Sequence, residues 1–493
     1  MSFGSLYFLT VFLPPVLLGH LLLQWLGSKC RLGTAPANIW LLAASLAACV
    51  LSDLRGLPVF LGCAVATDLL ARLLAASRSQ RVRRILLALA IVLNLGLLCY
   101  VKYAGVVAGW INALAGRPWV PVPELTLPLG ISFWVFRAIS YAMDVARGLH
   151  PPARNPIDFL CYMALFPIFV SGPIVRWADV SDAFSSRPFS APLAASGFRR
   201  LLVGFAKKVL LANQLALFAD AVWELASDGH AMSPGMAALG VAAYTLQLYF
   251  DFSGYSDMAI GLGRLLGFSF RENFLWPYAS ASIREFWRRW HISLSTWFRD
   301  YLYIPLGGSR RGTARTCLNG LVVFTLCGMW HGAGLLFALW GLWHGLLLCA
   351  ERLFGPRQTK GVPTPRRPPA VAALRFLAAH AYALASIAFG WILFRSATPS
   401  AAGVVLRSLA GLAPLSRESR TLWLDCTPLF EAVLVIGALL SLPVVPALRR
   451  VLRRLLPESA AWTLESLAAT ALGGAAFLFL VAGTQRSFLY FQF

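Results

Sequence analysis

The histidines His331 and His344 lie in an otherwise apolar segment, 317–350, and each follows a tryptophan and precedes a glycine. An ionisable side chain inside a membrane usually marks a functional path, which favours proton transfer by His331. The alternative is a hydrogen bond that holds two helices together. For His344 a structural role is favoured, because 13 residues correspond to about 220° of a continuous helix, which would place the two rings on different faces.

The backbone after His331 is expected to leave the helix, because Gly332 and Gly334 follow it. Irregular backbone at membrane depth is tolerated only against protein or a water-filled cavity, so the histidine is expected to face an internal path. The segment is too short for two full crossings, which need about 40 apolar residues, and too long for one. We therefore predict a pair of shortened or broken helices. Cys327, four residues before His331, offers a further hypothesis, a Cys–His nucleophile, although cysteine is also a common apolar filler.

A second cluster combines aromatic and basic residues over 283–303. Its four-residue aromatic and aliphatic spacing predicts an amphipathic helix at the cytoplasmic membrane surface. Two roles are open: a tryptophan belt that binds headgroups, or a cavity mouth where arginines bind a phosphate-rich ligand and His291 lines the entrance. The residues are Phe286, Trp290, Leu294 and Phe298 on the apolar face, with Arg284, Arg288, Arg289 and Arg299 as anchors.

Two carboxylates, Asp251 and Asp257, lie within an apolar span predicted over 235–266. Each needs a partner, such as Tyr, Ser or Arg in a neighbouring helix. Packing and a role at the site are both open for them.

The elements that carry these residues are membrane helices. The chain has 493 residues, of which 58% are hydrophobic and 13% charged, and its mean hydropathy is +0.68. The net charge of +22 comes from arginine clusters between apolar runs, which is the positive-inside pattern rather than a nucleic-acid surface. It places both termini on the outer side. The nine scattered cysteines form no C-x-x-C pair, which argues against a disulfide framework or a zinc site.

The predicted fold is all-α and polytopic, with about 11 to 13 transmembrane or re-entrant helices. The first apolar run has no basic leader, so it is expected to be the first span and not a cleaved signal peptide. Pro167 and Pro173 interrupt the run 157–175, which is either a span or re-entrant. The other expected spans are 5–26, 37–51, 57–76, 85–103 with an extension to about 115, 129–146, 201–225, 235–266, 371–395, 428–446 and 462–483.

Several long stretches resemble the membrane-bound O-acyltransferases, in particular the AlgI-like bacterial branch that helps to acetylate exported polysaccharides. The resemblance covers most of residues 125–345. Leu275, Trp276 and Arg271 depart from the family's pattern. The matching stretches are LPLGISFWVFRAISYAMD, FPIFVSGPIVR, YFDFSGYSDMAIGLGRLLGF, ENF, PY, REFWRRWHISLSTWFRDYLYIPLGG, GMWHGAG and FLYFQF.

The resemblance implies a catalytic core over 116–350 around a central funnel, an acyl-CoA donor on the cytoplasmic side and a hydroxyl acceptor on the other. N-terminal spans (1–115), a cytoplasmic linker (351–370) and C-terminal spans (371–493) flank this core. The family's principal histidine falls on His331, as general base, and its second histidine on His291, which would polarise or position the thioester. Gly332 and Gly334 are expected to offer N–H groups to the oxyanion. The expected substrate-binding residues are Arg288, Arg289, Trp330, Asp251 and Asp257.

The expected function is transfer of acetyl from cytoplasmic acetyl-CoA, across the bacterial inner membrane, to an exported alginate-like or cellulose-like polysaccharide. A separate periplasmic acetyltransferase is the expected partner, together with membrane lipid. No metal, no permanently bound cofactor and no nucleic acid is expected. The alternatives are an O-acyltransferase acting on peptidoglycan, lipid or protein, and a transporter in which Asp251, Asp257 and His331 form a relay.

Overall fold

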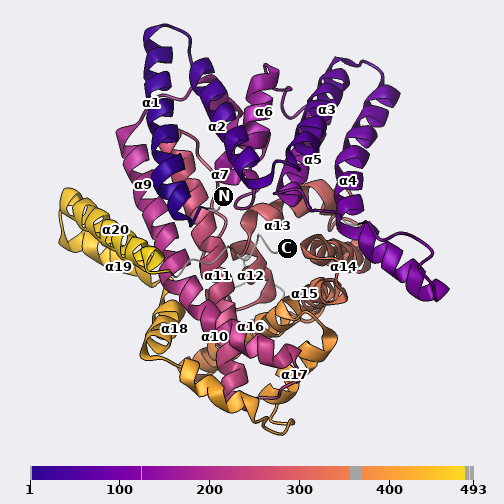
Figure 1. The fold of residues 1–493 in the computed structure, drawn as a ribbon, viewed down its shortest axis with the longest axis vertical. Helices are drawn as coiled ribbons and strands as arrows, with labels where there is room; N and C mark the ends of the chain where they lie inside the picture. Colours follow the sequence, from indigo (N-terminus) through magenta and orange to yellow (C-terminus); the bar gives the residue numbers. More distant parts are fainter. Residues whose placement is uncertain (1–2, 124, 356–367, 484–487, 489–493) are drawn as a thin grey trace. The chain divides into compact units, whose positions relative to one another are not determined.

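The protein is helical throughout the residues that its computed structural model describes, 3–123, 125–355, 368–483 and 488, and contains no strand there (Figure 1). Within these ranges eight helices are long and apolar enough to cross a membrane, or nine if one bent pair counts as a span. The all-α, multi-pass prediction is confirmed. The number is below the expected one, because several expected spans, among them 129–146 and 235–266, form helices that are too short or not apolar enough to be counted.

The chain divides into two compact units: a first unit of residues 1–205, 255–272 and 480–493, and a second unit of residues 206–254 and 273–479. One long helix, α11 (Pro234–Leu265), contributes to both. The boundary between α9 and α10 also falls at the division, where a π-helical turn, Lys207–Ala212, joins them.

The first unit begins with helical hairpins whose spans match the predicted ones closely. The fourth helix continues to Ala115, so the predicted extension beyond residue 103 is confirmed. The run 157–175 is broken after Ala164, as its prolines predicted. The helices are α1 (Leu13–Lys29), α2 (Ala35–Asp53), α3 (Leu57–Ala76), α4 (Gln80–Ala115), α5 (Ile131–Ala146), α6 (Pro156–Ala164), α7 (Phe166–Phe169), α8 (Trp177–Ser185) and α9 (Ala191–Ala206).

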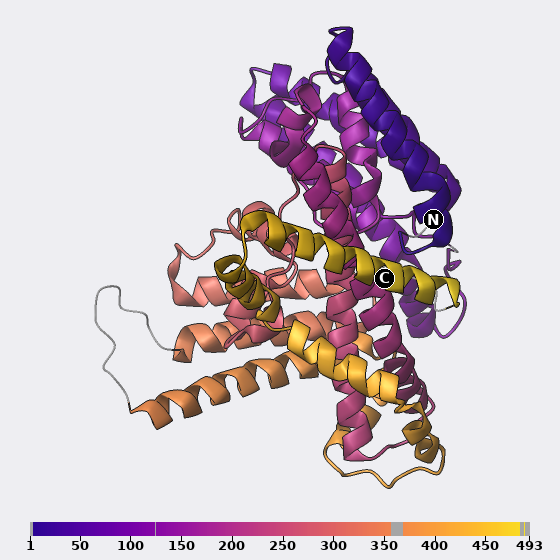
Figure 2. The ribbon, with the colours of Figure 1, turned by 90° about the vertical axis from the view of Figure 1, so that its left-hand side faces the viewer.

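The second unit carries the histidines and the basic aromatic segment. Figure 2 shows three of its helices, α14, α15 and α16, running side by side. The predicted span 428–446 is wrong in its last residues, because the helix ends at Leu440 and a separate short helix begins at Val444. The helices are α10 (Asn213–Ser227), α12 (Ile283–Arg289), α13 (Ile292–Phe298), α14 (Gly312–His331), α15 (Leu335–Phe354), α16 (Pro369–Arg395), α17 (Pro399–Leu409), α18 (Pro428–Leu440), α19 (Val444–Leu455) and α20 (Glu458–Val481).

The segment 317–350 forms the predicted broken pair. Helix α14 ends at His331, and α15 begins at Leu335 after three non-helical residues. The two helices approach so closely that a Cβ on Gly328 would overlap the carbonyl oxygen of Phe337, and a Cβ on Gly341 would overlap that of Phe324. Glycine at these two positions therefore sets the helix spacing that holds His331 in place.

The single amphipathic helix predicted over 283–303 is wrong in two respects. The segment breaks at His291 into α12 and α13 and then continues as a π-helical turn, Arg299–Tyr303. Its apolar stripe does not lie on a membrane surface: Phe286, Trp290 and Leu294 are at most 2% exposed. Helices that pack inside a protein and helices that lie on a membrane surface show the same apolar periodicity. The pattern alone therefore did not distinguish the two locations.

Candidate active site

His331 stands at the last residue of α14 inside a box of aromatic rings. Its imidazole is 4.7 Å from the ring of Trp330, 5.2 Å from Trp340 and 5.1 Å from Phe394, measured between centroids. The residue is 5% exposed. Gly332 and Gly334 have extended backbone, which confirms that the chain leaves the helix here. The rings exclude bulk water from a histidine whose backbone is not confined by a continuing helix.

His344 shares this aromatic cluster but belongs to the other helix, α15. Trp340 lies between them, because its ring is 5.2 Å from each imidazole. His344 is fully buried, and its Nδ1 accepts a hydrogen bond of 3.4 Å from Nε1 of Trp287. This arrangement supports the structural role that the sequence favoured for His344.

His291 occupies the break between α12 and α13. Its backbone φ of 42° is left-handed, a conformation that residues other than glycine rarely adopt. Surrounding contacts must therefore hold it in place. Asn273 provides this hold. Its Oδ1 accepts a 3.1 Å bond from the backbone N–H of Ser293, a 2.9 Å bond from the Ser293 hydroxyl, and a 3.2 Å contact from Nδ1 of His291. Asn273 was missed in the sequence, where only the ENF motif pointed to it.

The Asn273 contact fixes the tautomer of His291. A backbone N–H can only donate, so the Asn273 atom that faces Ser293 is the amide oxygen. The Nδ1 of His291 that also meets this oxygen must therefore carry the proton, which leaves the lone pair on Nε2. Burial lowers the pKa of His291 to about 3, so the imidazole is neutral near pH 7.

A run of ring contacts joins the two candidate catalytic histidines. From His331 it passes through Trp340 to Trp391, with a centroid separation of 5.9 Å, and from Trp391 to Trp290, 5.0 Å away. Trp290 directly precedes His291 in the chain. Both histidines therefore belong to one packed aromatic core of the second unit.

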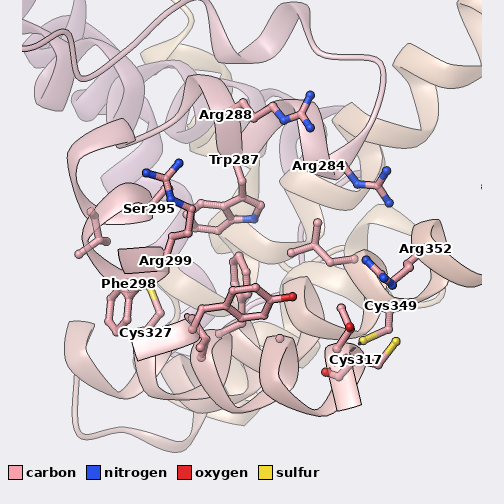
Figure 3. Close-up of a pocket in the computed structure, with 17 residues that line it drawn as sticks. Arg284, Trp287, Arg288, Ser295, Phe298, Arg299, Cys317, Cys327, Cys349 and Arg352 are labelled. Atoms are coloured by element: carbon pink, nitrogen blue, oxygen red, sulfur yellow. Dashed lines mark hydrogen bonds between the residues drawn. The ribbon is translucent and has the colours of Figure 1, made fainter. Parts of the chain in front are cut away.

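A basic cavity of about 300 Å³ lies beside this core (Figure 3). Four arginines line it, and Figure 3 shows their side chains arranged around Trp287. Cys327 lies on its wall, one helical turn before His331. The lining residues are Arg284, Trp287, Arg288, Leu294, Ser295, Phe298, Arg299, Tyr303, Thr316, Cys317, Gly320, Val323, Phe324, Cys327, Leu348, Cys349 and Arg352.

Only some of the predicted binding residues line the basic cavity. Arg288 lines it, whereas Arg289 forms a 2.5 Å ion pair with Glu285 and is absent from the lining. His291 is not among the residues that line this cavity, and its side chain is fully buried. Arg352, from the end of α15, was not linked to this site by the sequence, because 53 residues separate it from Arg299.

The two buried aspartates are held in ion pairs. Asp251 pairs with Lys208 at 2.5 Å within the second unit, and both side chains are at most 4% exposed. Asp257 pairs with Arg200 at 2.6 Å within the first unit, and Arg200 also binds Glu272. These contacts explain how carboxylates persist in apolar helices. Neither aspartate lines the basic cavity.

One of the two predicted oxyanion donors, the N–H of Gly332, already has a hydrogen-bond acceptor. The N–H of Gly332 donates a 3.4 Å bond to the carbonyl of Gly328, which closes the last turn of α14. Gly332 is therefore engaged as a helix terminus in this conformation.

No group of three or more potential metal-ligating side chains is found among the described residues.

A second cavity, of about 250 Å³, lies near the end of α16 and has the opposite charge balance. Its lining combines Trp223, Ser227 and two carboxylates with a single cation, Arg395, which forms a 2.9 Å ion pair with Asp220. Arg395 follows Phe394, whose ring contacts His331. The lining residues are Trp223, Glu224, Ser227, Asp228, Arg395 and Ala397.

A family model described as the membrane-bound O-acyltransferase family matches residues 128–391, more than half of the chain. This range contains His291, His331 and every residue that lines the basic cavity. The chain belongs to the membrane-bound O-acyltransferase family.

Relatives within the family share most of the chain's length. A probable alginate O-acetylase AlgI of Pseudomonas syringae is 41% identical over 432 residues, covering 85% of this chain and 78% of that protein. A probable alginate O-acetylase AlgI of Pseudomonas aeruginosa is 41% identical over 401 residues, covering 80% and 72%. A peptidoglycan O-acetyltransferase of Helicobacter pylori is 32% identical over 359 residues, covering 67% of each chain.

As a membrane-bound O-acyltransferase, the protein is a multi-pass membrane enzyme. This replaces the transporter hypothesis, in which Asp251, Asp257 and His331 formed a relay. The ion pairs of the two aspartates agree with that outcome, because each carboxylate already has a buried or half-buried cation as its partner.

Proposed function

We propose that this membrane-bound O-acyltransferase transfers acetyl from acetyl-CoA, bound at the basic cavity, toward the hydroxyl groups of an exported, alginate-like polysaccharide. The names of the AlgI relatives support the polysaccharide, and the positive-inside pattern supports a bacterial inner membrane with the basic cavity facing the cytoplasm. The observation that carries the proposal is the cavity itself, whose rim is lined with arginines and whose wall reaches Cys327, one turn from His331.

The cavity suits a phosphate-rich donor. Coenzyme A carries a diphosphate and a further phosphate, and guanidinium groups bind phosphate oxygens with two parallel hydrogen bonds. Arg284, Arg288, Arg299 and Arg352 lie where such groups would bind, and Trp287 offers a flat apolar surface between them. The apolar side chains Val323 and Phe324 continue the wall toward Cys327. A thioester arm that follows this wall approaches the end of α14.

His331 acts as the general base in the proposed reaction. The acceptor hydroxyl attacks the thioester carbonyl as His331 takes its proton; the new acyl–oxygen bond forms, the acyl–sulfur bond breaks, and the proton passes to the departing thiolate. A positioned base of this kind contributes about 10² to 10⁴ in rate. The rings of Trp330, Trp340 and Phe394 keep water from competing as the nucleophile.

His291 has a positioning role in this scheme. Its Nδ1 proton is committed to Asn273, and its Nε2 carries a lone pair, so Nε2 cannot donate a hydrogen bond to the thioester oxygen. Of the two roles expected from the sequence, polarising and positioning, the geometry supports positioning. His291 holds the α12–α13 break, and this break presents Arg284 and Arg288 on one side and Leu294 and Ser295 on the other.

The acceptor is assigned to the side of the second cavity. Phe394 contacts His331, and the next residue, Arg395, lines that cavity. Tryptophan and carboxylates are suited to a hydroxyl-rich ligand, because the indole packs on apolar sugar faces and the carboxylates accept hydroxyl protons. This cavity has two carboxylates and one arginine, so its net negative charge disfavours the binding of a polyanion such as alginate. A neutral acceptor group, supplied by a separate periplasmic acetyltransferase that then modifies the polymer, fits this balance better.

The test uses purified protein in liposomes with radiolabelled acetyl-CoA outside. Alginate oligosaccharide and a periplasmic extract are enclosed inside, and matched vesicles enclose peptidoglycan fragments. The proposal predicts label on the enclosed alginate and loss of transfer when acetyl-CoA is replaced by acetate. Label on peptidoglycan alone would refute the acceptor but keep the enzyme class. No release of coenzyme A in either vesicle would refute the acetyl-CoA donor.

A further inference from the structure

Helix α19 separates its arginines from its aliphatic residues. Its sequence is VVPALRRVLRRL, from Val444 to Leu455. At about 100° per residue, the four arginines fall within one arc of about 140°, and the aliphatic side chains fall within the remaining arc. The arginines are Arg449, Arg450, Arg453 and Arg454; the aliphatic residues are Val444, Val445, Ala447, Leu448, Val451, Leu452 and Leu455.

The rest of the protein does not bury the apolar face of α19. None of its twelve residues is buried. Leu448 is 56% exposed, Val451 49% and Leu455 73%. Exposing an apolar face of this size to water is unfavourable. Since the protein does not cover it, an apolar medium must do so.

The length and place of α19 identify that medium as the edge of the bilayer. Twelve residues extend about 18 Å, too little to cross a hydrocarbon core of about 30 Å. The helix follows the apolar α18 and precedes α20, which is a candidate membrane span. A short amphipathic helix that connects two membrane helices lies in the plane of the lipid–water boundary, with its apolar face toward the acyl chains.

The four arginines have two different environments. Arg449 and Arg453 lie 3.5 and 3.8 Å from Glu465 of α20, beside which Figure 1 places α19. Arg450 and Arg454 lie farther around the helix and are exposed, and within the described part of the chain they form no ion pair. The first pair anchors α19 to the protein, and the second pair is left facing the headgroup layer.

We propose that α19 is a binding site for anionic phospholipid, in which Arg450 and Arg454 hold the headgroup phosphates and the aliphatic face lies on the acyl chains. The charge complementarity selects this occupant: basic residues near a membrane surface attract anionic lipid, and arginine binds phosphate in a two-pronged geometry. The inference does not depend on the acyl-transfer reaction, because α19 contributes no residue to either cavity.

The experiment measures the lipids that the full-length protein retains. The protein is reconstituted in equal parts of phosphatidylglycerol and phosphatidylcholine and extracted gently, and the retained lipids are quantified by mass spectrometry. The test variant is R450Q/R454Q. The control R417Q/R420Q removes the same charge from two exposed arginines outside α19. The variant R450K/R454K keeps the charge.

Wild type and R417Q/R420Q are expected to enrich phosphatidylglycerol equally, R450Q/R454Q to lose at least about three-fold of that enrichment, and R450K/R454K to retain most of it. Salt at 0.5 M is expected to weaken the enrichment of wild type toward the level of R450Q/R454Q. Equal enrichment in R450Q/R454Q and wild type would overturn the proposal. An equal loss in both double glutamine variants would also overturn it, because the effect would then reflect net charge and not α19.

Discussion

The two cavities of the second unit differ in charge, size and wall chemistry. The basic cavity, about 300 Å³, combines four arginines with aromatic and apolar side chains. The acidic cavity, about 250 Å³, contains two carboxylates, a serine and one arginine that is itself paired with Asp220. The first suits a polyphosphate with an apolar arm, and the second suits hydroxyl groups.

This difference gives the proposed reaction a direction. The aromatic box of His331 touches elements of both sites: Cys327, one turn away, lines the basic cavity, and Phe394, in ring contact, precedes a residue of the acidic cavity. Acyl transfer between unlike ligands needs unlike binding sites on the two sides of one base. The following variants test whether each cavity has the specificity assigned to it.

Among the cavity variants, the largest effect is expected from the arginines of the basic cavity. Replacing Arg284 and Arg288 together with alanine should raise the KM for acetyl-CoA by about 10² or more, because each charge-assisted hydrogen bond contributes about 1.5 to 3 kcal/mol. Arg289→Ala is the control, since this arginine pairs with Glu285 outside the cavity. Steady-state release of coenzyme A measures both. Equal KM values for the double variant and the control would contradict the donor assignment.

Filling the basic cavity should have the next largest effect. Gly320 lines it, and a Cβ at this position would meet no other atom within 4 Å. Gly320→Leu therefore places a side chain in the cavity without disturbing the helix contacts, and we expect kcat/KM for acetyl-CoA to fall by about 10-fold to 30-fold through steric exclusion. Gly320→Ala should remain near wild type. If Gly320→Leu kept full activity, the donor arm would have to bind elsewhere.

Asn273→Ala should produce a moderate loss, of about 10-fold in kcat, because it leaves His291 and Ser293 without their common acceptor in a buried site. Asn273→Asp offers the comparison, since it keeps an acceptor oxygen. The same coenzyme A assay gives the rates, and thermal unfolding in detergent separates lost activity from lost folding. Full activity of Asn273→Ala would remove the positioning role assigned to His291.

The smallest effect is expected in the acidic cavity. Glu224→Gln with Asp228→Asn removes both carboxylate charges while keeping similar shapes, and we expect the KM for the acceptor to change by about three-fold, since partly exposed charges are screened. The KM for acetyl-CoA should not change. Transfer assays at varied acceptor and fixed donor concentration measure the first value. A change confined to the donor KM would reverse the assignment of the two cavities.

The sequence predicted well the features that depend on local chemistry. The break after His331 followed from Gly332 and Gly334, and the interrupted run 157–175 followed from its prolines. These residues act on their own backbone, so their effect can be inferred without knowing the rest of the fold. Hydropathy likewise predicted helices α2, α3 and α4 of the first unit to within about five residues, whereas the predicted span 201–225 begins ten residues too late, because α9 starts at Ala191.

The features that depend on distant contacts were missed. The break at His291 is held by Asn273, and Trp290-His291 carries no turn signal of its own. Arg352 joins the basic cavity because α15 returns alongside α14, and Lys208 pairs with Asp251 across two helices. Periodicity shows which face of a helix is apolar but not which neighbour covers it. For this reason the stripe over 283–303 was predicted at the membrane surface although it packs inside the protein.

The general-base role of His331 is tested most directly by comparing His331→Gln with His344→Gln in single-turnover release of coenzyme A from acetyl-CoA, in the presence of acceptor. Both histidines are buried against Trp340, so the two substitutions disturb the same aromatic cluster. Thermal unfolding in detergent confirms that both variants are folded. We predict a loss of at least about 10² for His331→Gln and less than about 10-fold for His344→Gln. Equal losses in the two variants, or full activity of His331→Gln, would contradict the account.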